Sequence, residues 1–250
     1  MKKVLRMLAA ALVLAMAGTA HATPSTTIWI PSTDIQGFGV VHFGADTYNC
    51  VIKEPTPANA TGNTIDYGLT VGVVPNDGTF GVEAGVDFRD ATGNSKNPWY
   101  FNAKAGIKEG AFGEMMPAIA AGGFDFGAKS STASATDFRT DSNILYAMAA
   151  KTLGALGRIS LGYFSGNDKV LVDDAGKADN TGILASWDKT INDKWWAAVD
   201  YQGGKSGYGA LSFGIAYTVS PNSSFIFGYN IYNNDKLHDP TFEFNYDVNF

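Results

Sequence analysis

The segment Thr241-Phe242-Glu243-Phe244-Asn245-Tyr246-Asp247-Val248-Asn249-Phe250 alternates between two kinds of side chain. Aromatic or aliphatic residues stand at every even position, and threonine, acids or amides stand at every odd position. Period-two alternation predicts a β-strand with one apolar and one polar face. A soluble strand seldom ends on an exposed phenylalanine, whereas a strand with lipid on one face and water on the other has this pattern.

The beginning of the chain has the organisation of an export signal. Residues 1–6 include the basic residues Lys2, Lys3 and Arg6, residues 7–16 form an apolar run, and Ala20-His21-Ala22 is a small-x-small pattern. This predicts a secretory signal peptide over residues 1–22, cleaved after Ala22. An N-terminal membrane anchor is the alternative, but the run is shorter than the roughly 20 residues that a spanning helix needs.

Composition separates the chain from several protein classes. Residues 1–22 hold three of the 18 Lys and Arg residues and none of the 24 acids, so their removal leaves a net charge of −9. Such acidity argues against a nucleic-acid partner. Charged residues make up 17% of the chain, below the quarter or so that is typical of soluble domains. Cys50 is the only cysteine, and no metal-binding or haem motif is present, so neither a metal nor a cofactor is expected.

Period-two alternation continues through the chain and predicts about twelve strands. They are expected at 37–48, 64–74, 79–90, 99–108, 116–127, 143–152, 158–165, 181–189, 195–202, 208–219, 224–233 and 241–250. The connections between them alternate between tight turns and longer polar loops, with 204–207 as the exception. This arrangement is typical of an all-β, up-and-down antiparallel transmembrane barrel with an even number of strands and both termini periplasmic. Ten to fourteen strands remain compatible with the pattern, because the first and fifth are weakly alternating.

A closing strand that ends in Phe250, in a chain that begins with a signal peptide, resembles the Gram-negative outer-membrane β-barrel proteins of porin-like type. The resemblance implies an outer-membrane location in contact with the lipid bilayer and lipopolysaccharide. It also implies that Phe250 is part of the signal read by the barrel-assembly machinery. A soluble all-β protein is the alternative, and aromatic residues near the strand ends argue against it.

The barrel is expected to occupy residues 37–250, after a separate lead over residues 23–36. Ile28-Trp29-Ile30-Pro31 in this lead is apolar but too short to span a membrane. The lead is interpreted as periplasmic or luminal, with part of an extra strand as a third possibility.

Inward-facing positions are where function is expected, because they contact the aqueous lumen. The pore-lining candidates are Asp66, Glu83, Asp87, Arg89, Lys104, Lys108, Lys151, Arg158, Asp188, Trp196, Asp200, Glu243 and Asp247. Two interpretations are open for these charges. They either line a water-filled passage with slight cation preference or form a salt-bridge network that plugs the barrel.

The sequence thus predicts a channel for passive passage of small hydrophilic solutes or ions, and not an enzyme. A non-conducting structural or adhesion barrel that acts through its extracellular loops is the first alternative. A lipid-modifying enzyme that uses His42 is the second, although no local sequence around His42 matches a known site of that kind. The sequence does not fix the transported solute or the oligomeric state.

Overall fold

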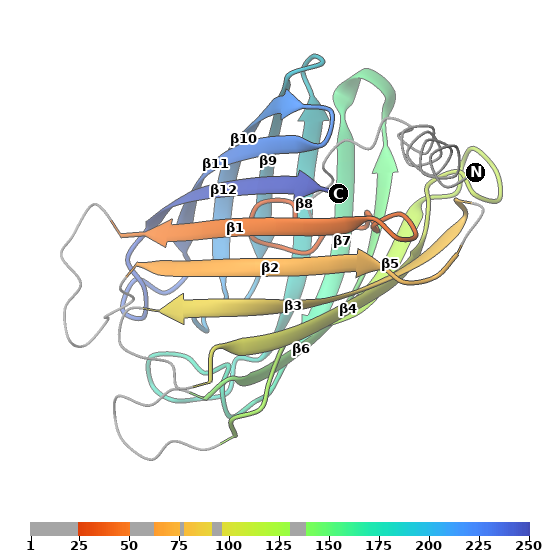
Figure 1. The fold of residues 1–250 in the computed structure, drawn as a ribbon. Coiled ribbons are helices and arrows are strands. Elements are labelled where there is room, and N and C mark those ends of the chain that lie inside the picture. The colour runs from red at the N-terminus through yellow and green to blue at the C-terminus, as the bar shows by residue number, and fades with distance from the viewer. Residues whose placement is uncertain (1–24, 51–62, 76–77, 92–96, 131–138) are drawn as a thin grey trace, which may run out of the picture.

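The computed structural model describes residues 25–50, 63–75, 78–91, 97–130 and 139–250. The predicted signal peptide and its cleavage site at Ala22 lie outside these residues. Within the described residues, no helix is long and apolar enough to cross a membrane. The described chain instead forms one closed sheet (Figure 1).

Twelve strands form this sheet, and every neighbouring pair is antiparallel. They are β1 Val41–Asn49, β2 Thr64–Gly72, β3 Phe80–Ala91, β4 Trp99–Ile107, β5 Ala118–Gly127, β6 Asp141–Thr152, β7 Arg158–Ser165, β8 Thr181–Thr190, β9 Trp195–Gln202, β10 Ala210–Ser220, β11 Ser223–Tyr232 and β12 Thr241–Asn249. Each strand pairs with its neighbours in sequence, and β12 closes the barrel on β1. The predicted all-β, twelve-strand, up-and-down barrel is therefore confirmed.

The two rims of the barrel differ in their connections. One rim, called the turn end, holds the connections 73–79, 108–117, 153–157, 191–194 and 221–222, and both the start of β1 and the end of β12. The 153–157 turn contains a short 3₁₀ segment, Gly154–Leu156. The opposite rim, called the loop end, holds the other connections, including 166–180, 203–209 and 233–240.

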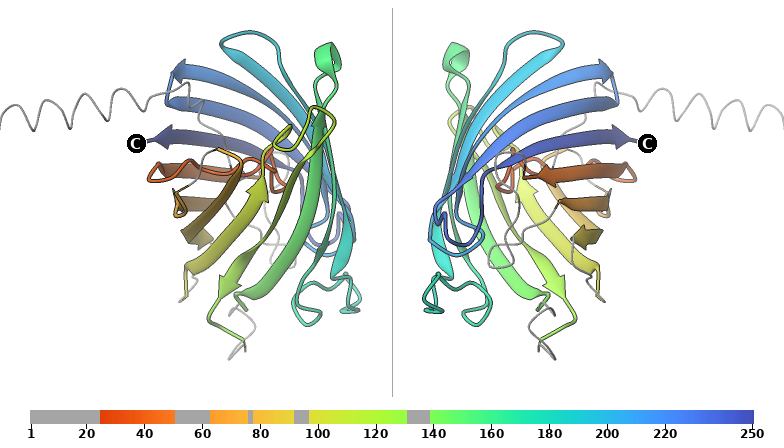
Figure 2. Two further views of the ribbon diagram at one scale, coloured as in Figure 1. Left: turned by 90° about the vertical axis from the view of Figure 1, so that its right-hand side faces the viewer. Right: turned by 90° about the vertical axis from the view of Figure 1, so that its left-hand side faces the viewer.

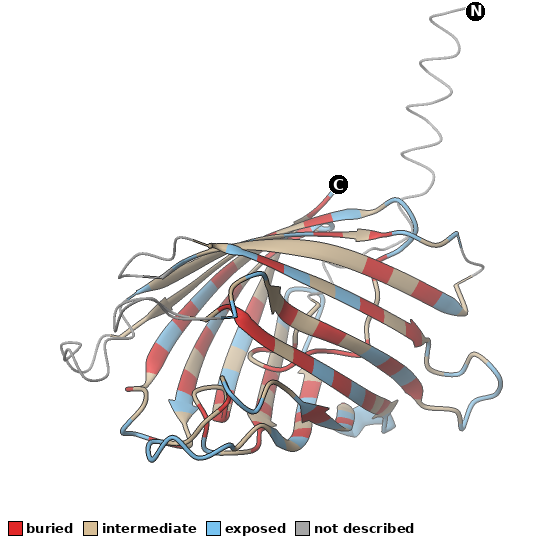
Figure 3. Ribbon diagram, turned by 90° about the horizontal axis from the view of Figure 1, so that it is seen from below, coloured by how far each residue is buried: buried red, intermediate tan, exposed pale blue. Residues whose placement is uncertain are grey.

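The outward face of the wall is apolar. Leu161 is 63% exposed, and Phe101 and Ile183 are each 56% exposed, while the positions that alternate with them are more buried. Figure 3 shows this alternation as bands along the strands. Soluble monomers rarely expose large continuous apolar surfaces. A closed sheet also leaves no unpaired strand edge, which is the requirement for strands in hydrocarbon.

Aromatic pairs lie on the outer face near both rims. Near the loop end, Phe88 packs on Trp99 with ring centroids 5.1 Å apart. Near the turn end, Trp195 packs on Tyr217 at 4.8 Å. Aromatic girdles at the two water interfaces are typical of membrane barrels.

Two strand predictions require correction. β1 begins at Val41 rather than at residue 37, because residues 37–40 form a turn in which Gly39 has a φ of 74°. In β6 the prediction that Lys151 lines the pore places the odd-numbered residues inward, whereas Ile144, Tyr146 and Met148 point into the barrel. Both faces of β6 are apolar, so its alternation alone does not determine which one meets lipid.

Candidate functional site

The described part of the lead, residues 25–36, folds back inside the barrel (Figures 1 and 2). It forms a tight reversal in which Thr27 N–H donates to the Ile30 carbonyl at 2.7 Å and Ser32 N–H donates to the Ser25 carbonyl at 3.0 Å. The side chains of Ile28 and Ile30 are 1% and 0% exposed. We call residues 25–36 the luminal lead.

Asp200, on β9, anchors the tip of the luminal lead. One carboxylate oxygen, Oδ2, accepts hydrogen bonds from the backbone N–H groups of Ile28, Trp29 and Ile30 at 2.8, 2.9 and 3.2 Å. These three hydrogen bonds are each stronger than a hydrogen bond between neutral groups, because their shared acceptor oxygen is charged. On the neighbouring strand, β10, lies Gly214, where any Cβ would collide with the Ile28 side chain.

A buried ion pair on β3 and β4 anchors the two ends of the lead. Glu83 and Lys104 lie 3.2 Å apart, with side chains each 3% exposed. The Glu83 carboxylate also accepts from the Ser25 hydroxyl and from the Gln36 N–H, at 2.9 and 2.7 Å. Lys104 Nζ donates to the Ser25 carbonyl at 3.3 Å. The two charges therefore satisfy polar groups of the lead as well as each other.

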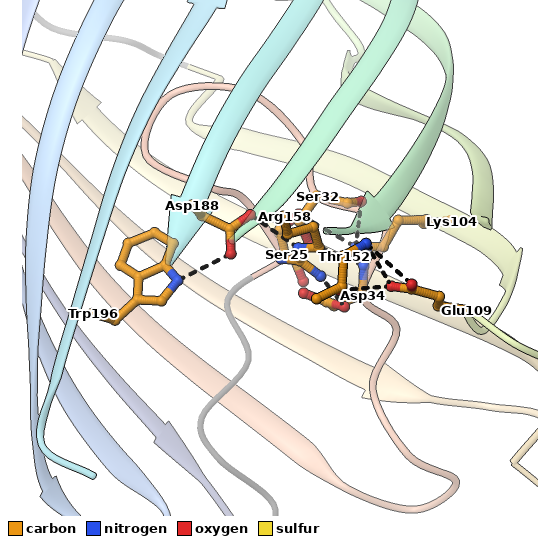
Figure 4. Close-up of polar contacts among 9 residues, drawn as sticks. All are labelled: Ser25, Ser32, Asp34, Lys104, Glu109, Thr152, Arg158, Asp188 and Trp196. Atoms are coloured by element: carbon orange, nitrogen blue, oxygen red, sulfur yellow. Dashed lines mark hydrogen bonds and ion pairs between the residues drawn. The ribbon is translucent and has the colours of Figure 1, made fainter. Parts of the chain in front are cut away.

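A chain of polar contacts joins the lead to the β7–β9 wall (Figure 4). Arg158 donates to Asp34 of the lead at 2.8 Å and to Asp188 at 2.9 Å. The indole N–H of Trp196 donates to the other Asp188 oxygen at 3.2 Å. These three wall side chains thus hold the lead in place rather than face open water.

Apolar contacts fill the lumen on the β5–β11 side. One cluster joins Ile30 of the lead to Ile144, Phe164 and Leu184 of the wall and to Leu171 of the 166–180 loop. A second cluster surrounds Ile28 with wall residues Ala198, Ala216 and Ile226. This half of the lumen is packed in the way a soluble core is packed.

The other half of the lumen contains a cavity of about 850 Å³. On β1 the cavity is lined by each inward residue from Tyr48, near the loop end, to His42, near the turn end. Six residue steps along a strand correspond to about 20 Å. The cavity therefore follows most of the height of the β1–β2 wall beside the luminal lead.

Carboxylates outnumber cationic groups around this cavity. Six lining residues carry carboxylates and three carry Lys or Arg charges. These are Asp46, Asp66, Glu83, Asp87, Asp125 and Asp247 on one side of the comparison, and Arg89, Lys104 and Arg139 on the other.

Arg89 organises the loop-end half of the cavity. Its guanidinium donates to Asp66 at 2.8 Å and to both oxygens of Asp125 at 2.9 and 3.1 Å. It also stacks 4.4 Å above the centre of the Tyr100 ring. Asp125 in turn accepts from the hydroxyl of Tyr208, which belongs to the 203–209 loop. The network thus connects that loop to four strands of the wall, β2 to β5.

Two loop-end segments meet at His238, above the same cavity. The His238 ring lies 4.9 Å from the Tyr232 ring and packs against Gly207 of the neighbouring loop. Burial lowers the pKa of the His238 imidazole to about 4, while the charge of Asp239 acts in the opposite direction. The imidazole is therefore neutral at pH 7.

The structure divides the thirteen pore-lining candidates into three groups. Those that line the cavity are Asp66, Glu83, Asp87, Arg89, Lys104 and Asp247. Those that face inward but do not line it are Arg158, Asp188, Trp196, Asp200 and Glu243. Those at the rim are Lys108 and Lys151.

The two rim lysines correct the sequence-based assignment. Lys108 follows the end of β4 and is exposed. Lys151 shares the outward face of β6 and pairs at 2.9 Å with Glu109 of a turn-end connection. Its inward assignment was wrong because it depended on the inverted faces of β6.

Sequence reasoning missed Asp125, Tyr208, Asp34 and Asp46 as luminal groups. Asp125 lies at a β-bulge with a positive φ of 56°, which interrupts the alternation of an already ambiguous strand. Tyr208 and Asp34 lie outside regular strands. Asp46 could have been found, because it alternates with His42 and Tyr48 on the polar side of the first strand.

Solved structures with the same fold include the KdgM porin, which is 9% identical with a TM-score of 0.50, over 84% of this chain and 98% of that one. The KdgM porin in complex with disordered oligogalacturonate is 10% identical with a TM-score of 0.52, over 84% and 99%. An outer membrane channel from Pseudomonas putida F1 is 9% identical with a TM-score of 0.51, over 87% and 97%. The chain has the fold of outer-membrane porins. No protein-family model and no curated protein matches its sequence.

Proposed function

We propose that this protein is an outer-membrane channel of porin-like type, for passive passage of small hydrophilic solutes or ions. The observation that carries the proposal is the cavity that follows β1 from Tyr48 to His42 beside the luminal lead. The closed wall, its apolar outer face and its aromatic pairs at both rims support a position in a lipid bilayer.

The size of the solute follows from the interior. Eight-strand barrels are filled by side chains, whereas sixteen-strand porins leave an aqueous channel. Twelve strands give an intermediate interior, and the luminal lead takes up part of it. The passage that remains suits small solutes.

The charge of the cavity bears on the kind of solute. One structural neighbour, the KdgM porin, was solved with an oligogalacturonate, which is an acidic sugar. Here carboxylates outnumber Lys and Arg around the cavity, so acidic sugars would meet repulsion. We therefore propose neutral or cationic solutes for this channel.

A non-conducting barrel that acts through its loops is the second candidate. The observation that favours it is the packing of the luminal lead and of Leu171, from the 166–180 loop, in the lumen. A lipid-modifying enzyme has less support. Both ring nitrogens of His42 are engaged, one by Asn249 at 2.8 Å and the other by Asp247 at 3.2 Å, which leaves neither free to act on a nucleophile.

The proposal includes the route to the membrane. The signal peptide would be removed after Ala22, and the closing strand with Phe250 would be recognised by the barrel-assembly machinery. Both termini of the barrel would then lie in the periplasm, with the loop end outside and lipopolysaccharide around the outer rim.

Single-channel recording in planar bilayers tests the proposal. The purified protein is first shown to be folded by heat-modifiable migration in SDS gels. Discrete current steps in potassium chloride are expected. Folded protein that gives no steps would favour the non-conducting barrel.

A further inference from the structure

Four carboxylates face one another across β12, β1, β2 and β3. In one row of the sheet, Asp247 pairs with Gly44, Gly44 with Gly68, and Gly68 with Asp87. In the next row toward the loop end, Asp46 pairs with Asp66. The two glycines carry no side chain, and the Asp87 carboxylate lies over Gly68, where a Cβ would be 2.9 Å from its Oδ1. We call the space above the two glycines, bounded by Asp46, Asp66, Asp87 and Asp247, the acidic pocket.

These carboxylates have little compensation from Lys or Arg. Oδ1 of Asp247 lies 3.2 Å from Nε2 of His42. Asp66 shares Arg89 with Asp125. Asp87 accepts only a neutral amide hydrogen bond, from Asn102 at 2.8 Å. Asp46 makes no hydrogen bond or ion pair with any of the described residues. Like charges at this spacing repel one another, and a cation between them would remove that repulsion.

Buried oxygen atoms without partners provide a second observation. The side chain of Asp247 is 6% exposed, and its Oδ2 has no hydrogen-bond partner among the described residues. The same is true of Oδ1 of Asn245, a residue 3% exposed, and of Oδ1 of Asp66. All three residues line the cavity. Buried acceptors are normally satisfied, so this wall lacks a donor.

Aromatic rings border the acidic pocket toward the loop end. Trp29 lies edge-on to both Tyr48 and Tyr232, with ring centroids 5.6 Å apart in each case. All three residues line the same cavity as the acids. Aromatic faces attract ammonium and guanidinium groups through their quadrupole and also cover alkyl chains.

The spacing of the acids distinguishes an organic cation from a metal ion. No group of three His, Cys, Asp or Glu residues in the described part of the chain could hold a metal ion. The backbones of Asp87 and Asp247 stand three strands apart, which is about 14 Å at the usual strand spacing, and their carboxylates lean over the two glycines between them. The cavity of about 850 Å³ has the volume of a small-molecule site. Four carboxylates from four strands, in a cavity of this size, match a ligand with more than one cationic group.

We propose that the acidic pocket binds small organic cations that carry ammonium groups on an alkyl chain. Asp46, Asp87 and Asp247 supply the carboxylates, and Tyr48 and Trp29 contact the chain. This inference names the solute class of the channel proposed above and to that extent rests on it. Binding and conduction are separate measurements, so each can fail alone.

Isothermal titration of the detergent-solubilised, folded barrel with spermidine tests the inference. Saturable binding that weakens as salt is added is expected, because the contacts are charged. Asp46→Asn and Asp87→Asn should each weaken binding at least tenfold. The matched control is Asp193→Asn, an exposed aspartate in the turn between β8 and β9, which should bind spermidine as the parent does.

Gly44→Ala provides a variant that keeps every charge. Its methyl group would lie in ordinary contact with Asp247 and Asp46, at 3.7 and 3.8 Å, so the barrel should fold while the pocket narrows. At least threefold weaker binding is expected. Absence of spermidine binding to the folded parent, or equal weakening by Asp193→Asn, would overturn the inference. Spermidine binding by a folded protein that gives no channel current would contradict the proposed channel function but would support the acidic pocket as a binding site.

Discussion

Asp200→Ala should weaken the attachment of the luminal lead to the barrel wall. The substitution removes the acceptor of three backbone N–H groups, those of Ile28, Trp29 and Ile30. Each buried donor left without a partner costs about 1–3 kcal/mol. Because the three N–H groups share one oxygen, we expect their combined loss to destabilise the docked lead by about 3–5 kcal/mol. Removal of one partner from a buried ion pair has a cost of the same size.

The lead should nevertheless remain docked most of the time in this variant. Burial of Ile28 and Ile30 contributes about 1.5–3 kcal/mol for each side chain. The ion pair of Glu83 and Lys104 also still holds both ends of the lead. The expected effect is therefore more frequent opening of the lead, by about 100-fold or more, since each 1.4 kcal/mol corresponds to a factor of ten.

Thiol labelling measures this opening. Ser32 is 3% exposed, so Ser32→Cys in a Cys50→Ser background reports release of the lead through its rate of reaction with a maleimide. Asp200→Ala should raise that rate at least 100-fold. Asp200→Asn keeps an oxygen acceptor without the charge and should give an intermediate rate. A rise below threefold for Asp200→Ala, in a barrel that still migrates as folded, would refute this account of the anchor.

Three further predictions concern the ion pair, the outer face and the loop end. Lys104→Met should lower the free energy of unfolding, measured by urea titration, by about 3–5 kcal/mol, because it leaves buried Glu83 unpaired. The double variant Lys104→Met/Glu83→Gln should recover at least half of the lost free energy. No recovery would contradict the pairing of Glu83 with Lys104. Leu161→Arg should cost about 2–4 kcal/mol in lipid vesicles, and an unchanged unfolding midpoint would show that this exposed position does not meet lipid. The pKa of His238, about 4, lies below its ordinary value, so the loop stability it contributes is complete above about pH 6.5 and is lost as the pH falls toward 4, by up to ~3 kcal/mol. Tryptic cleavage at Lys236 is measured relative to cleavage of an unfolded lysine peptide at the same pH, because trypsin itself slows in acid. The relative rate should be greater at pH 5 than at pH 7.5, and His238→Phe should abolish the difference; an equal relative rate for the parent at both pH values would refute it.

The wall of the barrel could be predicted from the sequence because the polarity of alternate residues distinguishes the two faces of each strand. Phe242 and Glu243 differ in polarity, and the same contrast recurs in most strands, so lipid and lumen could be distinguished locally. β6 is the informative failure. Ile144 and Leu145 are both apolar, and Ile144 faces inward only because Ile30 and Leu171 are there to cover it.

The candidate site was less predictable because it depends on contacts between distant residues. The route of residues 25–36 through the barrel decides which inward charges hold the lead and which line the cavity. The hydrogen bond from Ile28 to Asp200 joins positions 172 residues apart, and no local pattern in either segment announces it. The short length of the apolar run at 28–31 was a correct reason to exclude a membrane span, but it gave no information about where the run would pack.

Solutes are expected to pass along the β1–β2 wall, beside the lead, and not through the packed half of the lumen. Thr70 on β2 and Ser186 on β8 both face inward and are each 6% exposed, but only Thr70 lines the cavity. Single-channel current is therefore recorded for Thr70→Cys and Ser186→Cys, each in a Cys50→Ser background, before and after addition of a charged methanethiosulfonate. We expect stepwise reduction of the current for Thr70→Cys and none for Ser186→Cys. The reverse pattern, or no current from either folded protein, would contradict the account.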